Sequence, residues 1–133
     1  MVRPKTKTHE QLTASELQVM NVLWQKKSAN ARDVLTTINE DSEKELAYTT
    51  VSTVLRVLEK KGFVTSEKDG KTHLYAPIAS KTAYQKKATK ELVKSVFLGK
   101  PTALVKNLLG SEEISADELE DIEKMIGDLK KKL

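Results

Sequence analysis

The sequence predicts a mainly α-helical protein in two parts, with three helices and a β-hairpin in the first part and three helices in the second. Three observations predict this fold. Apolar residues recur at helical spacing through most of the chain. An Asp-Gly dipeptide stands between two short runs that favour β-strands, as in a tight hairpin. Two capping boxes, Thr13–Glu16 and Ser115–Glu118, mark the starts of the first and last helices.

The first two helices are placed by their caps and their apolar stripes. The first helix begins at Thr13 and extends to about Lys27. Its stripe consists of Leu17, Met20, Leu23 and Trp24. Asn30 can cap a second helix, which has Asp33 in its first turn and fades near Glu40. The buried face of this second helix is predicted to be Val34, Leu35 and Ile38.

The third helix is predicted to run into the hairpin. It extends from about Ala47 to Lys61, and Gly62 ends it because glycine readily adopts the left-handed conformation found after helices. The strands are predicted at residues 63–68 and 72–76, with Asp69-Gly70 as the turn and Pro77 at the end of the second strand.

The third helix has an apolar face and a polar face. At about 100° per residue, the apolar face holds Val51, Val54, Leu55 and Leu58. The opposite face holds Thr49, Ser52, Thr53 and Arg56. Short polar side chains on a helix that packs through its other side are typical of helices that contact base edges in a DNA major groove. Lys68 and Lys71 flank the hairpin turn and are predicted to contact phosphates, whereas Tyr75 is predicted to pack.

The second part is predicted to contain three amphipathic helices. The first carries Tyr84, Ala88, Leu92 and Val96 on one side and ends near Gly99. Pro101 can open a short helix that Gly110 ends, and the last helix follows Ser115. So small a helical unit buries little by itself, so we expect self-association to cover its apolar stripes. The predicted dimer residues are Leu92, Val96, Leu104, Leu108, Leu119, Ile122, Ile126 and Leu129.

Composition excludes several classes of protein. The chain has no cysteine, which excludes a disulfide framework and a thiolate metal site, and it shows no catalytic constellation. We therefore expect no enzyme, no cofactor and no metal. There is no run of about 18 apolar residues, so no membrane insertion is expected and the cytoplasm is the predicted location. The net charge of +4 conceals a basic segment, residues 80–110, with seven lysines and one acid. A basic stripe is compatible with a nucleic-acid partner.

These patterns divide the chain into three predicted segments. Residues 1–11 form a basic arm, residues 12–79 a DNA-binding domain and residues 80–133 a helical dimerisation domain. The arm carries Arg3, Lys5 and Lys7, which are either solvated or reach a neighbouring groove.

Four stretches of the chain carry a resemblance to a known family. They are SELQVMNVLWQKKSANARDVLTTI, AYTTVSTVLRVLEKKGFV, the wing with HLYAP, and the tail LVKNLLGSEEISADELEDIEKMI. Together they resemble the penicillinase-repressor family, the BlaI/MecI type of bacterial winged-helix repressors. The wing and the tail are the more specific stretches, because winged helices in general share the first half.

The resemblance implies a winged helix-turn-helix that acts as a homodimer, binds double-stranded palindromic operators of the TACA/TGTA kind and represses transcription. The C-terminal helices would form the dimer interface. By position, Thr49, Thr50, Ser52 and Thr53 would read bases, and Arg56 and the wing would lie near phosphates. The best-known members have a lysine and an arginine where this chain has Thr49 and Ser52, so their base preference does not carry over.

The resemblance also implies a candidate cleavage site. Members in the β-lactam response are inactivated by a cut at an Asn-Phe bond that a sensor-linked protease triggers. The matching pair here is Asn107-Leu108, in which leucine keeps the site apolar. Antibiotic or cell-wall stress would then be the signal, although not every relative responds to β-lactams. Copper-sensing relatives use C-terminal cysteines, which this chain lacks.

A second function remains open at this point: a winged-helix module that binds a partner protein without sequence-specific DNA binding. Acidic residues on the polar face of the third helix would favour it. That face has no acidic residue among Thr49, Ser52, Thr53 and Arg56, so DNA binding is the preferred interpretation.

Overall fold

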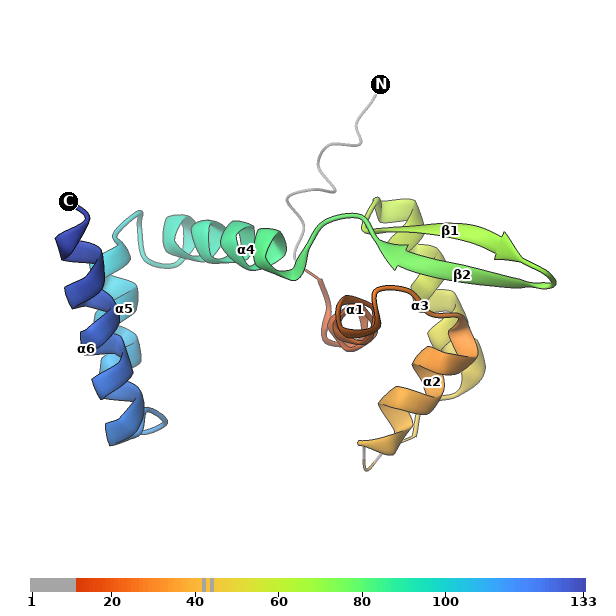
Figure 1. Ribbon diagram of the computed structural model, residues 1–133, viewed down its shortest axis with the longest axis horizontal. Helices are drawn as coiled ribbons and strands as arrows, with labels where there is room; N and C mark the ends of the chain where they lie inside the picture. Colours follow the sequence, from red (N-terminus) through yellow and green to blue (C-terminus); the bar gives the residue numbers. More distant parts are fainter. Residues whose placement is uncertain (1–11, 42, 44) are drawn as a thin grey trace, which may run out of the picture. The chain divides into compact units, whose positions relative to one another are not determined.

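The computed structural model describes residues 12–41, 43 and 45–133, and the predicted basic arm lies outside the described residues. The described part of the chain divides into two compact units, with the first ending at Ala88 and the second beginning at Thr89. Figure 1 shows the order of the elements. They are α1 (Ala14–Lys26), α2 (Ala31–Glu40), α3 (Tyr48–Lys61), β1 (Val64–Asp69), β2 (Thr72–Pro77), α4 (Lys81–Ser95), α5 (Pro101–Leu109) and α6 (Ala116–Lys131).

The core of the first unit lies between its three helices and the hairpin. The predicted apolar stripes of α1, α2 and α3 all contribute to it, but α1 also buries Val19 and Val22, which its predicted stripe omits. The largest fully buried side chains are Val19, Met20, Leu23, Val34, Val51, Leu55, Leu58 and Val64. Trp24, predicted to be a core residue, packs against this cluster while staying partly exposed. Three helices and a two-stranded hairpin around one core form a winged helix, as predicted.

The helix ends follow the predicted caps closely. At the start of α1, the Thr13 N–H donates to the Glu16 carboxylate (2.9 Å) and the Glu16 N–H donates to the Thr13 hydroxyl (3.2 Å), which completes the capping box. The Asn30 side chain accepts from the Asp33 N–H at 2.8 Å and caps α2. Gly62 ends α3 in the left-handed conformation, with φ at 88°. The predicted caps therefore set the bounds of these helices.

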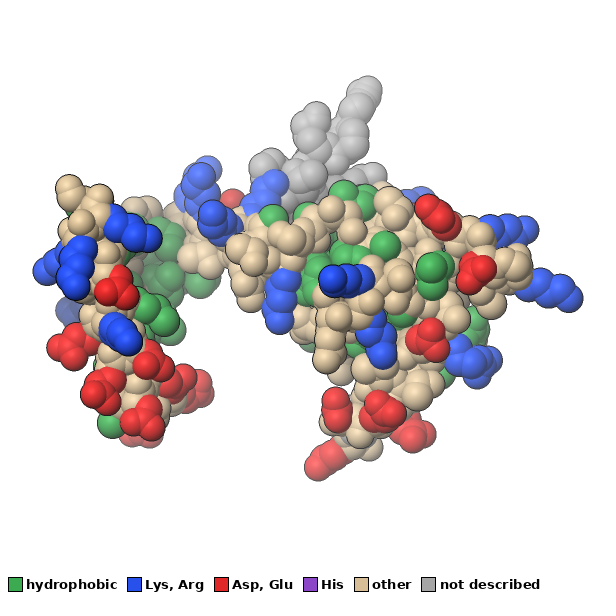
Figure 2. All heavy atoms as spheres, viewed as in Figure 1, with side chains coloured by type: hydrophobic (Ala, Val, Ile, Leu, Met, Phe, Trp, Pro, Cys, Tyr) green, Lys and Arg blue, Asp and Glu red, His purple; other side chains and the backbone are tan. Residues whose placement is uncertain are grey.

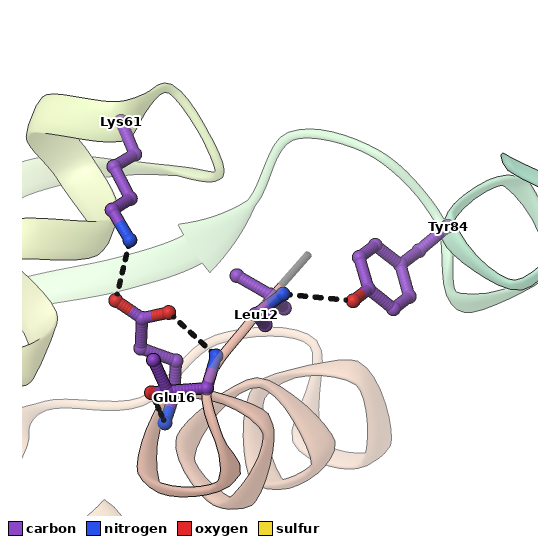
Figure 3. Close-up of polar contacts among 5 residues, drawn as sticks. Leu12, Glu16, Lys61 and Tyr84 are labelled. Atoms are coloured by element: carbon purple, nitrogen blue, oxygen red, sulfur yellow. Dashed lines mark hydrogen bonds and ion pairs between the residues drawn. The ribbon is translucent and has the colours of Figure 1, made fainter. Parts of the chain in front are cut away.

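Glu16 also connects α1 to α3. The second oxygen of its nearly buried carboxylate pairs with the Lys61 ammonium at 2.9 Å, as Figure 3 shows. Burial by itself raises the pKa of Glu16, but the hydrogen bonds from Thr13 and the Lys61 charge outweigh burial and hold the pKa below its usual value. The carboxylate is thus charged and fully paired at neutral pH.

The hairpin is antiparallel, and its register runs from Val64 opposite Pro77 to Asp69 opposite Thr72. The turn is therefore the two-residue loop Gly70-Lys71, with Gly70 at φ 66°. The predicted turn, Asp69-Gly70, is wrong by one residue because Asp69 still pairs as the last residue of β1. A loop that opens with glycine is typical of a tight hairpin turn. A short bridge between Ala29 and Tyr75 extends the sheet toward α2.

The beginning of α4 packs on the winged helix through Tyr84. Its ring lies 5.7 Å from Trp24 and 6.3 Å from Phe63 between centroids, and its hydroxyl accepts from the Leu12 N–H at 3.0 Å (Figure 3). The Trp24 indole N–H donates to the Ala79 carbonyl at 3.0 Å, just before α4. The sequence assigns Tyr84 only to the apolar stripe of the second part, so its contact with the first-unit core is new.

The three C-terminal helices form as predicted, with one difference at the end of α4. That helix ends at Ser95 and not near Gly99, because Leu98 and Gly99 adopt positive φ angles of 52° and 80° and close the helix with a turn. Pro101 occupies the first turn of α5, and Ser115 and Glu118 form the second predicted capping box before α6. None of the described residues of these three helices is buried.

Candidate nucleic-acid interface

The polar side chains of α3 lie on its exposed face, opposite the core. Thr49, Thr50, Thr53 and Arg56 are exposed, and Ser52 is half-buried at the edge of this face. On the other side, Val51, Leu55 and Leu58 are completely buried. The structure therefore brings the predicted base-reading residues together on one surface, although their role stays a prediction. We call these five residues the α3 face.

Two contacts fix the α3 face in place at opposite ends of the helix. At the C-terminal end, Lys61 pairs with Glu16 of α1. Before the N-terminal end, the Asn39 side chain accepts from the Leu46 N–H (2.8 Å) and donates to the Leu46 carbonyl (3.2 Å). Asn39 thereby closes the connection between α2 and α3 and satisfies backbone groups that would otherwise need water. A helix held at both ends can present side chains in a defined orientation.

The wing places positive charge beside the α3 face. Lys68 and Lys71 are exposed near the tip of the hairpin, where Figure 2 shows basic side chains gathered. Lys68 stands opposite His73 in the register, and Lys71 lies in the turn loop. Both positions leave the ammonium groups accessible to a phosphate, although that contact stays a prediction.

Tyr75 is a packing residue, as predicted. It is 8% exposed and belongs to the first-unit core. Burial, together with the nearby Glu59 carboxylate, raises the pKa of its hydroxyl, while Arg56 acts in the opposite direction. Its phenol is therefore neutral at physiological pH. The His73 ring lies 6.4 Å from the Tyr75 ring and remains exposed.

Sequence reasoning missed a pair of residues next to the α3 face. Arg32, in the first turn of α2, places its guanidinium carbon 5.2 Å from the centroid of the Tyr48 ring, at the start of α3. Tyr48 is 45% exposed. A cation is attracted electrostatically to the face of an aromatic ring, so the Arg32–Tyr48 contact is favourable. No local spacing links residues 32 and 48, so only the folded arrangement of the two helices could reveal the pair.

The predicted dimer residues remain accessible on α4, α5 and α6, and Val96 lies directly after the end of α4. Leu92, Val96, Leu108, Leu119, Ile126 and Leu129 are exposed, and Leu104 and Ile122 are half-buried. The predicted cleavage pair, Asn107-Leu108, is exposed on α5 but lies within its helical residues. Asp117 and Glu118 lie in the first turn of α6 and Lys130 and Lys131 in its last turn, an arrangement that the helix macrodipole favours.

Neither a metal-ligand cluster nor a membrane-spanning helix is found among the described residues. Among residues 12–41, 43 and 45–133, no three histidine or carboxylate side chains cluster as metal ligands would. Within the same residues, no helix is both long and apolar enough to cross a membrane. The hydroxyls of the α3 face can donate and accept hydrogen bonds, which suits recognition of base edges, and the Arg56 guanidinium can donate, which suits a phosphate.

Known proteins match this sequence over most of its length. A family model described as the penicillinase repressor matches residues 12–128. The methicillin resistance regulatory protein MecI of Staphylococcus aureus strain N315 is 31% identical over 120 residues, which cover 90% of this chain and 95% of MecI. The penicillinase repressor of Staphylococcus aureus is 26% identical over 122 residues, which cover 92% of this chain and 95% of that protein.

Two solved structures are similar to this chain over different lengths. The structure of Bacillus licheniformis BlaI in monomeric form with the blaP half-operator is 30% identical and covers 55% of this chain and 87% of that chain, with a TM-score of 0.46. RosR of H. salinarum is 18% identical, covers 93% of this chain and 98% of that chain, and has a TM-score of 0.53, a likeness of fold alone. Because the family model spans both units, the chain belongs to the penicillinase repressor family.

Proposed function

We propose that this protein is a homodimeric transcriptional repressor that binds a palindromic DNA operator through the α3 face and the wing. The proposed repressor is not an enzyme. Because its partner is DNA, we propose that it works in the cytoplasm. The observation that carries the proposal is the α3 face itself: exposed hydroxyls and one guanidinium stand on a helix whose other side is completely buried. Membership in a family described as repressors supports the same function.

In the proposed complex, α3 enters the major groove and the wing lies along the adjacent backbone. Thr49, Ser52 and Thr53 contact base edges, and Arg56 and Lys71 neutralise phosphates. Hydroxyls distinguish bases more weakly than a bidentate arginine–guanine pair does. Such a pair contributes about 1–3 kcal/mol of discrimination against the wrong base. Specificity then depends on dimer spacing and DNA shape as well as on direct contacts.

Dimerisation is proposed to occur through α5 and α6. Leu119, Ile126 and Leu129 of α6, with Leu108 of α5, are large apolar side chains left 45–62% exposed in the single chain. Exposed apolar residues repeated along helices without a fully buried side chain favour association with a second copy.

Inactivation is proposed to occur by cleavage of the Asn107-Leu108 bond under the control of a sensor-linked protease in an antibiotic or cell-wall stress response. The bond lies inside α5, so a protease needs this helix to unwind before the backbone can enter its cleft. A cut there would split the proposed dimer region and remove bivalent binding. Incubation with the sensor protease of the source organism and mass analysis of the fragments tests this step.

The test of the repressor function begins with selection of bound duplexes from a random pool. The recovered operator and an unrelated duplex are then titrated with the full-length protein at two salt concentrations. We expect a palindromic consensus, and we expect binding that falls steeply with salt. Affinity that depends on neither sequence nor salt would reject the proposal and favour a protein-binding module.

Variants of the α3 face make the test specific. Thr53→Ala and Arg56→Ala should each weaken operator binding, by about 10-fold per half-site contact, with circular dichroism unchanged because both side chains are exposed. Lys26→Ala, an exposed substitution on α1, is the matched control and should bind normally. Normal operator affinity in both α3 variants would reject the assigned surface.

A further inference from the structure

A hollow lies between the α3 face, the first turn of α2 and the wing. It has a volume of about 310 Å³ and is open to solvent, and its lining includes Arg32, Tyr48, Ser52, Lys71 and His73. Ser52 belongs to both the hollow and the α3 face, so the two surfaces are continuous. None of the base-reading residues predicted from the sequence, apart from Ser52, lines it.

The chemistry of the hollow is that of an anion site. Arg32 and Lys71 approach it from different elements, His73 adds ring nitrogens, and the hydroxyls of Tyr48 and Ser52 can donate hydrogen bonds. None of the described residues lining the hollow is acidic. The Arg32 guanidinium lies against the Tyr48 ring, and within the described residues it has no carboxylate partner. Arginine, lysine and hydroxyl side chains are those that bind DNA phosphates most often.

The arrangement of α3 gives the hollow a place beside the DNA backbone. Tyr48, Ser52 and Arg56 follow at intervals of four residues, so they form one row along the helix. Ser52 and Arg56 of this row belong to the α3 face, and Tyr48 and Ser52 line the hollow together with Lys71 and His73 of the wing. When the α3 face meets base edges, the strand that bounds the groove runs past this row, between α3 and the wing.

We propose that this hollow binds one phosphodiester strand of the operator, with Arg32 and Lys71 neutralising a phosphate from two sides. Arg32 has a second role, since its contact with the Tyr48 ring holds the tyrosine hydroxyl at the edge of the hollow. The proposal rests on the repressor function above and adds α2 to the DNA-binding surface. The contact is to the backbone, so it strengthens binding to any duplex and carries little base preference.

The experiment measures full-length protein binding to the selected operator and to an unrelated duplex at four salt concentrations. Arg32→Gln should weaken both complexes by a similar factor. It should also reduce the slope of log affinity against log salt by about 0.9 for each phosphate that is no longer neutralised, and so by about 2 for a dimer. Arg32→Lys should keep the slope but bind more weakly than the original protein, because lysine lacks the planar guanidinium that stacks on a ring. Lys26→Gln is the charge-matched control, because it also removes one positive charge but from a position outside the hollow. The dependence of its log affinity on log salt should equal that of the original protein.

Tyr48 gives a second measurement that does not depend on charge. Tyr48→Phe keeps the ring for Arg32 and should lose only the hydroxyl contact, whereas Tyr48→Leu should resemble Arg32→Gln in affinity while keeping the salt slope. Ethylation interference on the operator locates the phosphate directly. Arg32→Gln should abolish interference at one position in each half-site and leave the others, even if its overall stability were lowered.

The two proposals fail in different ways. If Arg32→Gln keeps the full salt slope and every interference position while Thr53→Ala still loses operator affinity, the hollow is not a phosphate site and the repressor function stands. If the original protein binds no duplex in a salt-dependent manner, the repressor function fails and the phosphate site fails with it.

Discussion

Glu16 shows how one side chain can hold two elements of the winged helix together. Its carboxylate closes the capping box of α1 and pairs with Lys61 at the end of α3, from a side-chain position that is 7% exposed. Charged hydrogen bonds in such a site are stronger than neutral ones, and each also satisfies a group that would be costly to bury alone. Because α3 carries the candidate DNA-binding face, we expect Glu16 to affect DNA binding only through the position of that helix.

We predict that Glu16→Gln lowers the free energy of unfolding by about 1–3 kcal/mol. Glutamine keeps the shape and one acceptor for the Thr13 N–H, but it loses the charge that pairs with Lys61. Chemical denaturation followed by circular dichroism measures the loss. Glu67→Gln, at an exposed site on β1, is the matched control and should stay within about 0.5 kcal/mol of the original protein. Equal losses in the two variants would contradict the role of the Glu16–Lys61 pair.

The same carboxylate predicts an acid-sensitive part of the stability. The folded state holds the pKa of Glu16 below the value of 4.5 that it has when unpaired. The contribution of Glu16 to the free energy of unfolding is therefore complete above that value, and it is lost as the pH falls through the lower pKa of the folded state. The difference in unfolding free energy between the original protein and Glu16→Gln should be constant from pH 7 to about 5 and should narrow below about pH 4. A difference that widened with acid would show that the sign of this shift is wrong.

At the scale of elements, two glycines should respond oppositely to the same substitution. Gly62 ends α3 with φ at 88°, and a Cβ there would meet no neighbour within 4 Å, so Gly62→Ala costs only backbone strain, about 1–2 kcal/mol. Gly127 lies inside α6 with open space around its Cα and no positive φ, so Gly127→Ala should raise helix stability by about 0.5–1 kcal/mol. Thermal unfolding measures both. Changes of the same sign in the two variants would contradict the assigned backbone conformations.

The elements themselves were predictable wherever a local pattern determines them. Capping boxes at Thr13 and Ser115 and the glycine after α3 mark helix ends through backbone hydrogen bonds among near neighbours. The predicted turn was wrong by one residue because Asp69-Gly70 and Gly70-Lys71 both suit a tight loop. Which of the two forms the loop is determined by the strand register. The end of α4 was placed too late because nothing in the local pattern signals that Leu98 adopts a positive φ.

The candidate site could be predicted from the sequence along α3 and at the wing turn, where Lys68 and Lys71 lie. Helical periodicity places Thr49, Thr53 and Arg56 opposite the buried face without any knowledge of the rest of the chain. The Arg32–Tyr48 pair and the contact of Tyr84 with Trp24 join residues far apart in sequence. Such contacts arise from packing of one element on another, which periodicity does not report.

At the scale of the whole molecule, the two units contribute different kinds of surface. The buried core of the described chain comes entirely from residues between Leu12 and Tyr75. The helices after that point have no fully buried residue among those described, and Leu108, Leu119, Ile126 and Leu129 are exposed. A unit with its own core can fold and contact DNA alone, whereas helices without one gain most from a second copy. The proposed operator affinity then depends on linking two modest DNA contacts.

We therefore predict that truncation after Lys100 gives a folded monomer with weak operator binding. The shortened chain keeps the full core of the first unit and loses α5 and α6, so it should unfold cooperatively and bind a single half-site as the full-length protein does. Its affinity for the complete palindrome should fall by about 10²–10⁴-fold, because the second half-site no longer benefits from a linked partner. Sedimentation velocity and titration of half-site and full-site duplexes measure these effects. Ile126→Asp with Leu129→Asp in the full-length chain is the control, since it places charges on the same α6 stripe and should also give monomers. A truncated chain that still sediments as a dimer would place the interface in the winged helix instead.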